Sequence, residues 1–122
     1  MITNCLAVGA GGFIGSIFRY LIGLIPALSK HTIPFQTLFV NVLGAVFIGM
    51  IVQSAETSNF ISGPMLLFLK VGICGGFTTF STFSLEALGF LEKGDGFLFA
   101  VYAALSLILC IAGVFLGKSL IH

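Results

Sequence analysis

The chain has 122 residues, of which 58% are hydrophobic and only 7% are charged. Soluble globular domains carry about 25% charged residues, so this composition excludes an ordinary soluble protein and predicts an integral membrane protein in a lipid bilayer. The formal net charge of +1 excludes the strongly basic surface of a nucleic-acid-binding protein, and no nucleic-acid partner is expected.

Four apolar blocks are long enough to cross a bilayer, which takes about 20 residues as a helix. They lie at about residues 5–28, 35–52, 65–91 and 97–117. The connections between them are short, so we predict a single all-α domain, residues 1–122, of four transmembrane helices. Both chain ends are then on the same side of the membrane. No basic segment precedes the first block, which favours a retained helix over a cleaved signal peptide.

The first block contains Gly11 and Gly15 at the spacing that lets two membrane helices approach closely. This spacing fits packing within one chain and also a seam between two chains. Towards the end of the block lies Arg19, a charge of the kind that is rare and usually functional inside membrane segments. Arg19 can extend to the interface, or it can give a vestibule the positive potential that collects anions.

The second block places Thr37, Asn41 and Gly44 on one helix face, because they are four and three residues apart. The Asn41 amide brings two N–H donors and one acceptor into the apolar region. One hypothesis is a hydrogen bond to another helix, and the other is a donor to a passing anion. Position alone favours the first hypothesis.

The third block contains an unusual segment, residues 72–84, with three glycines followed by five Ser or Thr residues and three phenylalanines. Each glycine weakens a helix by about 1 kcal/mol relative to alanine, and Thr78 and Thr79 are β-branched. We therefore predict a broken third helix, with the break near 75–79. Carbonyl groups freed by such a break can surround a cation.

Beyond the predicted break, Phe77, Phe80 and Phe83 follow one another at intervals of three residues. An aromatic ring has a positive edge, so a ring presented edge-on can stabilise an anion. Glu86 continues a polar face that begins at Thr79 and Thr82 and ends in this carboxylate.

Helix directions bring Arg19 and Glu86 towards the same membrane side, so an ion pair between them is one possibility. The fourth block carries Tyr102, Ser106, Cys110 and Gly113 along one stripe. The two hydroxyl groups can extend a hydrogen-bonding track beside Asn41, although a tyrosine near a helix end can also anchor the helix at the interface.

The lysines and arginines give almost no preferred orientation by the positive-inside rule. One side has Lys70 and Lys118, and the other has Arg19, Lys30 and Lys93. We expect Lys70 to extend to its nearer interface. So weak a bias allows insertion in both orientations, and two opposed copies of the chain can then pair.

Three motifs together closely resemble the Fluc/CrcB family of fluoride channels, over essentially the whole chain. They are residues 11–20 (GGFIGSIFRY), 37–44 (TLFVNVLG) and 72–83 (GICGGFTTFSTF). Two positions depart from the family's usual pattern, Ser16 and Gln36. Gln36 lies at the membrane edge, so its departure concerns only how the second helix begins.

The resemblance implies a fluoride-specific channel, not an enzyme, in the bacterial cytoplasmic (inner) membrane, which passively exports F⁻ and lowers cytoplasmic fluoride. It implies an antiparallel, dual-topology homodimer with two pores and a structural, untransported Na⁺. The implied fluoride pathway comprises Asn41, Phe80 and Phe83 with the polar lining positions Thr37, Ser81, Thr82, Tyr102 and Ser106. The implied Na⁺ ligands are the backbone carbonyls of Gly75 and Thr78. Arg19 resembles the family's arginine near the pore mouth, and Glu86 resembles its carboxylate in the third helix.

The main alternative is a small multidrug-resistance-type antiporter that exchanges cations for protons. Such a protein also has four helices and often inserts in both orientations. It needs a carboxylate embedded in the first helix, where this chain has Arg19 and no acid. The sequence therefore favours the channel.

Overall fold

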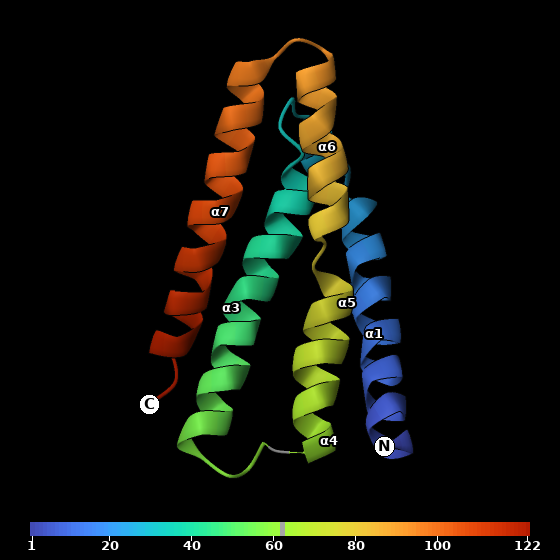
Figure 1. Cartoon of the computed structure of the whole chain (residues 1–122), viewed down its shortest axis with the longest axis vertical. Coiled ribbons are helices and arrows are strands. Elements are labelled where there is room, and N and C mark those ends of the chain that lie inside the picture. The colour runs from blue at the N-terminus through green and yellow to red at the C-terminus, as the bar shows by residue number, and fades with distance from the viewer. Residues whose placement is uncertain (62) are drawn as a thin grey trace.

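The computed structural model describes residues 1–61 and 63–122. Four helical spans in these residues are long and apolar enough to cross a membrane. They are α1 (Ile2–Gly23), α3 (Phe35–Thr57), the composite span Gly63–Glu92 and α7 (Gly96–Ser119). The four spans run roughly alongside one another, and both chain ends lie towards the same end of the bundle, as expected from an even number of crossings (Figure 1).

The first two spans end at residues other than those expected. The first was expected to continue to residue 28, but α1 ends at Gly23 and a separate short helix, α2 (Pro26–Ser29), follows. Pro26 has no N–H group and cannot continue a helix, so it begins a new one. The second was expected to end at residue 52, but α3 continues to Thr57. The polar residues after 52 extend the helix beyond the apolar segment, and their backbone groups keep the helical hydrogen bonds.

Gln36 joins the start of α3 to the end of α1. Its side-chain Nε2 donates to the carbonyl oxygen of Gly23 over 2.9 Å. That carbonyl belongs to the last turn of α1, where backbone oxygens have no helical donor. Gln36 thus supplies a contact between two helices.

The third span consists of four helical segments, namely α4 (Gly63–Leu66), the π-helical η1 (Leu67–Cys74), α5 (Gly75–Phe77) and α6 (Phe80–Glu92). Between α5 and α6, Thr78 and Thr79 adopt extended conformations, with ψ angles of 161° and 115°. Gly75 itself is helical, with φ −64° and ψ −38°. The chain therefore leaves the helix at the two β-branched threonines and not at the glycines before them.

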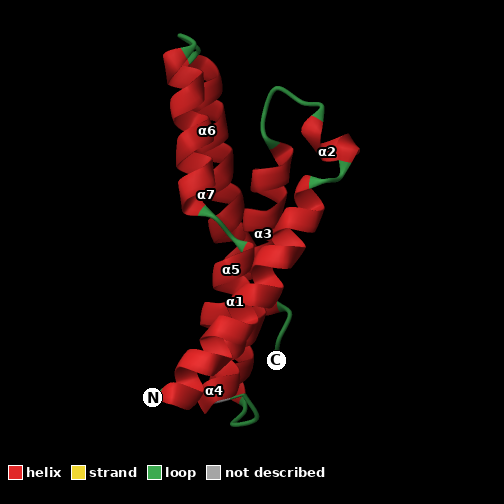
Figure 2. Cartoon of the chain, turned by 90° about the vertical axis from the view of Figure 1, so that its right-hand side faces the viewer, coloured by secondary structure: helices red, strands yellow, loops and turns green. Residues whose placement is uncertain are grey.

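The interruption lets the third span change its packing partner. Below it in Figure 1, η1 and α5 pack against α1, and above it α6 packs against α7. Figure 2 shows the consequence from the side, where α6 and the adjoining half of α7 lean one way and α2 leans the other. The two threonines thus lie where the span passes from one neighbour to the next.

Close packing of α1 depends on glycine. A Cβ atom on Gly11 would overlap the Phe68 carbonyl, and one on Gly15 would overlap the carbonyl of Ile73. Gly72 faces the Gly11 backbone in return, where a Cβ would come within 2.7 Å of the Gly11 Cα. The Gly11–Gly15 spacing is therefore used for packing within one chain, which decides between the two interpretations that the sequence left open.

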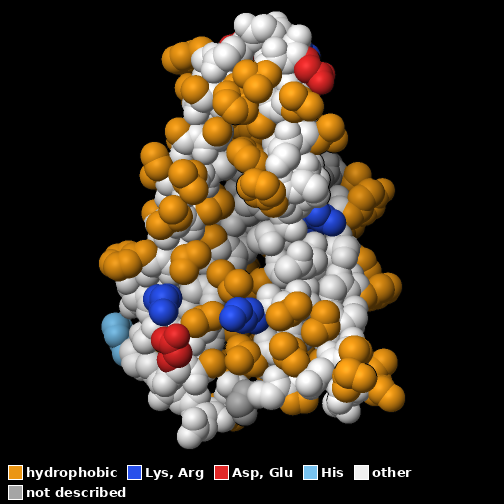
Figure 3. Space-filling view, in the orientation of Figure 1, with side chains coloured by type: hydrophobic (Ala, Val, Ile, Leu, Met, Phe, Trp, Pro, Cys, Tyr) orange, Lys and Arg blue, Asp and Glu red, His pale blue; other side chains and the backbone are white. Residues whose placement is uncertain are grey.

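The α3–α7 pair packs in the same way, with Gly117 of α7 against the Val46 carbonyl and Gly49 of α3 against that of Val114. Near the other end of these helices, Tyr102 is fully buried with Leu38, Ala87 and Phe90. Elsewhere large apolar side chains are exposed, and the face in Figure 3 is mostly hydrophobic with few charged side chains. Such a surface suits a lipid bilayer.

Candidate functional site

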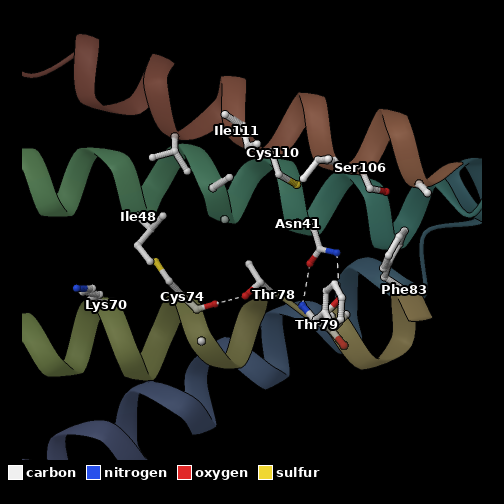
Figure 4. Close-up of a pocket in the computed structure, with 17 residues that line it drawn as sticks. Asn41, Ile48, Lys70, Cys74, Thr78, Thr79, Phe83, Ser106, Cys110 and Ile111 are labelled. Carbon is white, nitrogen blue, oxygen red and sulfur yellow. Dashed lines mark hydrogen bonds between the residues drawn. The ribbon is translucent and has the colours of Figure 1, made fainter. Parts of the chain in front are cut away.

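The Asn41 side chain bridges the helix interruption. In an uninterrupted α-helix the Thr79 N–H would donate to the Gly75 carbonyl. It donates instead to Asn41 Oδ1 over 2.7 Å, and Asn41 Nδ2 donates to the Thr79 carbonyl over 3.0 Å (Figure 4). One side chain of α3 therefore satisfies both backbone polar groups of Thr79.

Asn41 also retains a free donor. Its amide group carries two N–H bonds, and only one of them has a partner among the described residues. Asn41 lines a cavity, so the second N–H is available to an acceptor there. The two hypotheses for Asn41, contact between helices and donor to an anion, are therefore compatible.

The hydroxyl group of Thr79 begins α6. Thr79 Oγ1 accepts from the Thr82 N–H over 3.2 Å and donates to Thr82 Oγ1 over 3.0 Å. Threonine is a favoured residue at this position, because its oxygen satisfies an amide that has no helical partner. Thr79 is thus held by Asn41 through its backbone and by Thr82 through its side chain.

Backbone carbonyls lose their helical donors on the other side of the interruption. The Thr78 N–H donates to the Cys74 carbonyl over 3.0 Å and completes the last turn. In a continuous helix the next carbonyl, that of Gly75, would accept from the Thr79 N–H, but this N–H donates to Asn41 Oδ1. Gly75 is exposed, and no atom lies within 4 Å of the place where its Cβ would be.

A cavity of about 630 Å³ extends along this region, between α3, the third span and α7. Most of its walls are apolar. Its polar or aromatic lining includes Asn41, Thr78, Thr79, Phe80, Phe83 and Ser106 (Figure 4). The cavity therefore brings polar side chains and aromatic rings from three spans to one place.

The aromatic rings form a continuous series. The ring centres of Phe80 and Phe83 are 5.7 Å apart, and those of Phe83 and Tyr102 are 5.0 Å apart. Tyr102 continues to Phe90 at 5.9 Å. Phe80 is 79% exposed, whereas Tyr102 and Phe90 at the other end of the series are buried. Phe83 therefore connects an exposed ring to buried ones.

Two buried hydroxyl groups, those of Tyr102 and Ser106, have no hydrogen-bond partner among the described residues. Leaving a buried polar group without a partner costs about 1–3 kcal/mol. Ser106 lines the cavity, and Tyr102 packs directly behind Phe83. The unused donor of Ser106 fits a polar ligand that enters the cavity.

Glu86 forms a hydrogen bond and not the ion pair that the sequence allowed. Thr37 Oγ1 donates to Glu86 Oε1 over 2.6 Å. The ion pair found in residues 1–61 and 63–122 joins Lys118 and Glu56 at 3.5 Å, and both side chains are partly exposed. Arg19 and Glu86 are thus not paired, and neither of them lines the cavity.

The predicted site residues fall into four groups. Those lining the cavity are Asn41, Phe80, Phe83, Ser106, Gly75 and Thr78. Thr37 and Tyr102 lie buried beside it, and Ser81 and Thr82 are exposed on the first turn of α6. Arg19 and Glu86 stand apart from its lining.

Two polar or charged lining residues, Thr79 and Lys70, had no site role in the sequence interpretation. A threonine three residues before a helical amide is a recognisable start signal, so the role of Thr79 in beginning α6 could have been predicted. The place of Lys70 in the lining could also have been predicted from its spacing, because it precedes Thr78 by eight residues and shares its helix face.

Comparison with known proteins places the chain in a family. Residues 6–118 match the family described as CrcB-like protein, Camphor Resistance (CrcB). A protein of Ruminiclostridium cellulolyticum named fluoride-specific ion channel FluC is 42% identical over 118 residues, which cover 96% of this chain and 91% of the relative. Proteins of the same name from Agrobacterium fabrum and Elusimicrobium minutum are 44% and 45% identical, each over 96% of this chain and over 94% and 92% of the relative.

The match extends over all four spans and includes each residue that lines the cavity at the interruption. The chain belongs to the CrcB-like protein family.

Proposed function

We propose that this protein is a fluoride-specific ion channel, the function for which its relatives are named. The observation that carries the proposal is Asn41, which keeps one N–H without a partner among the described residues and lines a cavity together with Phe80 and Phe83. A small, strongly hydrated anion needs donors to replace its water when it enters a narrow path. The channel is not an enzyme, and transport is passive.

The proposed pathway uses partial charges. Asn41 offers an N–H, Ser106 offers a hydroxyl hydrogen, and Phe80 and Phe83 can offer the positive edges of their rings. A fixed positive charge at the centre would hold the ion, whereas conduction requires binding that also releases it. Among the described lining residues the charged side chain is that of Lys70, at the opposite end of the cavity from Phe83 (Figure 4), so the donors beside Asn41, Phe80 and Phe83 are uncharged.

The cellular role follows from the chemistry of hydrogen fluoride. The neutral acid crosses a membrane from an acidic exterior and ionises in the more alkaline cytoplasm, where F⁻ accumulates. A passive channel in the bacterial inner membrane then lets F⁻ leave along its electrochemical gradient. We therefore infer that the protein lowers cytoplasmic fluoride.

We further propose that two copies assemble as an antiparallel, dual-topology homodimer. The near balance of Lys and Arg on the two sides supports insertion in both orientations. Exposure of Phe80, which is 79% accessible in one chain, supports a partner surface at the interruption. A second copy would cover this region and complete the wall of the cavity.

A structural Na⁺ is proposed for the same interface. The Gly75 carbonyl has lost its helical donor, and the Thr78 carbonyl lies in the extended segment that follows. Carbonyl oxygens are suitable ligands for a hard cation, so the donors present fit Na⁺. One chain supplies few such oxygens, and Gly75 and Thr78 of both copies would hold the ion. The cation would offset the partial negative charge of the facing carbonyls and join the two copies.

Fluoride efflux from liposomes containing the purified protein tests the proposed activity. We expect a passive, rapid fluoride efflux and little or no chloride efflux under the same gradient, because the donors are arranged for a small anion. Ion-selective electrodes measure both anions, and protein-free liposomes are the control. Equal rates for chloride and fluoride, or no fluoride efflux, would contradict the proposal.

The two phenylalanines provide a test of the pathway. Phe80→Ile and Phe83→Ile remove a ring edge and keep an apolar side chain of useful volume, so each should slow fluoride efflux at least about tenfold, the equivalent of roughly 1.4 kcal/mol. Phe13→Ile is the matched control, because Phe13 is exposed on α1 and does not line the cavity. Wild-type efflux from both test variants would mean that the rings only pack.

Removal of Na⁺ tests the proposed cation through assembly as well as transport. Replacing Na⁺ with a large organic cation should weaken the dimer and reduce fluoride efflux, because the carbonyls of Gly75 and Thr78 would face one another without compensation. Analytical ultracentrifugation in detergent measures the dimer, and added Na⁺ should restore it. A dimer of unchanged stability in Na⁺-free buffer would rule out this role.

A further inference from the structure

One charged side chain lines the cavity at the interruption, that of Lys70. Lys70 lies on η1 and shares a helix face with Cys74 and Thr78, four and eight residues further on. Figure 4 shows it at one end of the cavity, with Phe83 at the other end and Asn41 between them. The cavity thus has a cationic end and an aromatic end.

No carboxylate neutralises Lys70 in the part of the chain that the structure describes. The ion pair recorded there joins Lys118 to Glu56 at 3.5 Å. Lys70 is exposed on this chain, so its ammonium group is not enclosed by protein, and its apolar stem can lie along the helix. The sequence predicted only that this side chain would extend to an interface, whereas the structure shows it in the cavity lining.

We infer that Lys70 attracts anions to one mouth of the pathway and so sets the rate at which fluoride enters. This inference rests on the proposed function. A positive charge beside a cleft with low-dielectric walls raises the local concentration of anions and their rate of association. Lys70 therefore acts before the ion meets Asn41.

Distance explains how a full charge can serve here without holding the ion. Eight residues, roughly two helical turns, separate Lys70 from Thr78 along the third span. Exposed charges are largely screened beyond about 8 Å at physiological ionic strength. The ammonium group can thus enrich anions at the mouth and leave binding beside Asn41 to the neutral donors.

Fluoride efflux at two ionic strengths tests this inference, with an impermeant salt used to move from about 10 mM to about 300 mM. At low ionic strength Lys70→Gln should lower the rate about three- to tenfold, and Lys70→Glu should lower it further. Lys70→Arg should keep the rate near that of the wild type, because it keeps the charge. At high ionic strength the variants should converge, because salt screens the charge that distinguishes them.

Lys118→Gln is the matched control, since it removes a lysine that pairs with Glu56 outside the cavity. It should leave efflux unchanged at both ionic strengths. If Lys70→Gln equals the wild type at low ionic strength, Lys70 has no part in entry. An equal loss at both ionic strengths would show a packing effect and would also overturn the inference. Absence of fluoride efflux from the wild type would instead refute the proposed function itself.

Discussion

The paired hydrogen bonds between Asn41 and Thr79 are the interaction on which the rest of this structure depends. An extended segment inside a membrane span exposes backbone groups that lipid cannot satisfy. Asn41 satisfies both polar groups of Thr79, at 2.7 Å and 3.0 Å, and the Thr79 hydroxyl begins the next helix. The interruption is therefore a stable feature of the fold.

Several functional features follow from this one contact. The third span packs on α1 before the interruption and on α7 after it, and the cavity lies between α3, the third span and α7. The Gly75 carbonyl is freed, and Asn41 is held with its second N–H available to the cavity. The same two residues thus shape the place where a cation is proposed to bind and the place where an anion is proposed to pass.

The sequence was sufficient for the features that depend on local chemistry. Apolar length predicted four spans, and the four spans are present; glycine and β-branched residues indicated 75–79, and Thr78 and Thr79 are extended there. It was insufficient where distant residues meet. Asn41 and Thr79 are 38 positions apart, and nothing local marks the π-helical η1. The ends of α1 and α3 were also wrong, because the apolar count gave too little weight to Pro26 and to the polar turn after residue 52.

The most direct test of the central claim is fluoride efflux from liposomes containing Asn41→Leu. Leucine has nearly the same size and shape, but it can neither hold Thr79 nor donate to an anion. Hydrogen bonds to charged groups are worth about 1.5–3 kcal/mol, so the account predicts that efflux falls at least about tenfold, measured on the fraction of Asn41→Leu protein that is correctly assembled. Efflux at the wild-type rate from a correctly assembled Asn41→Leu protein would contradict it.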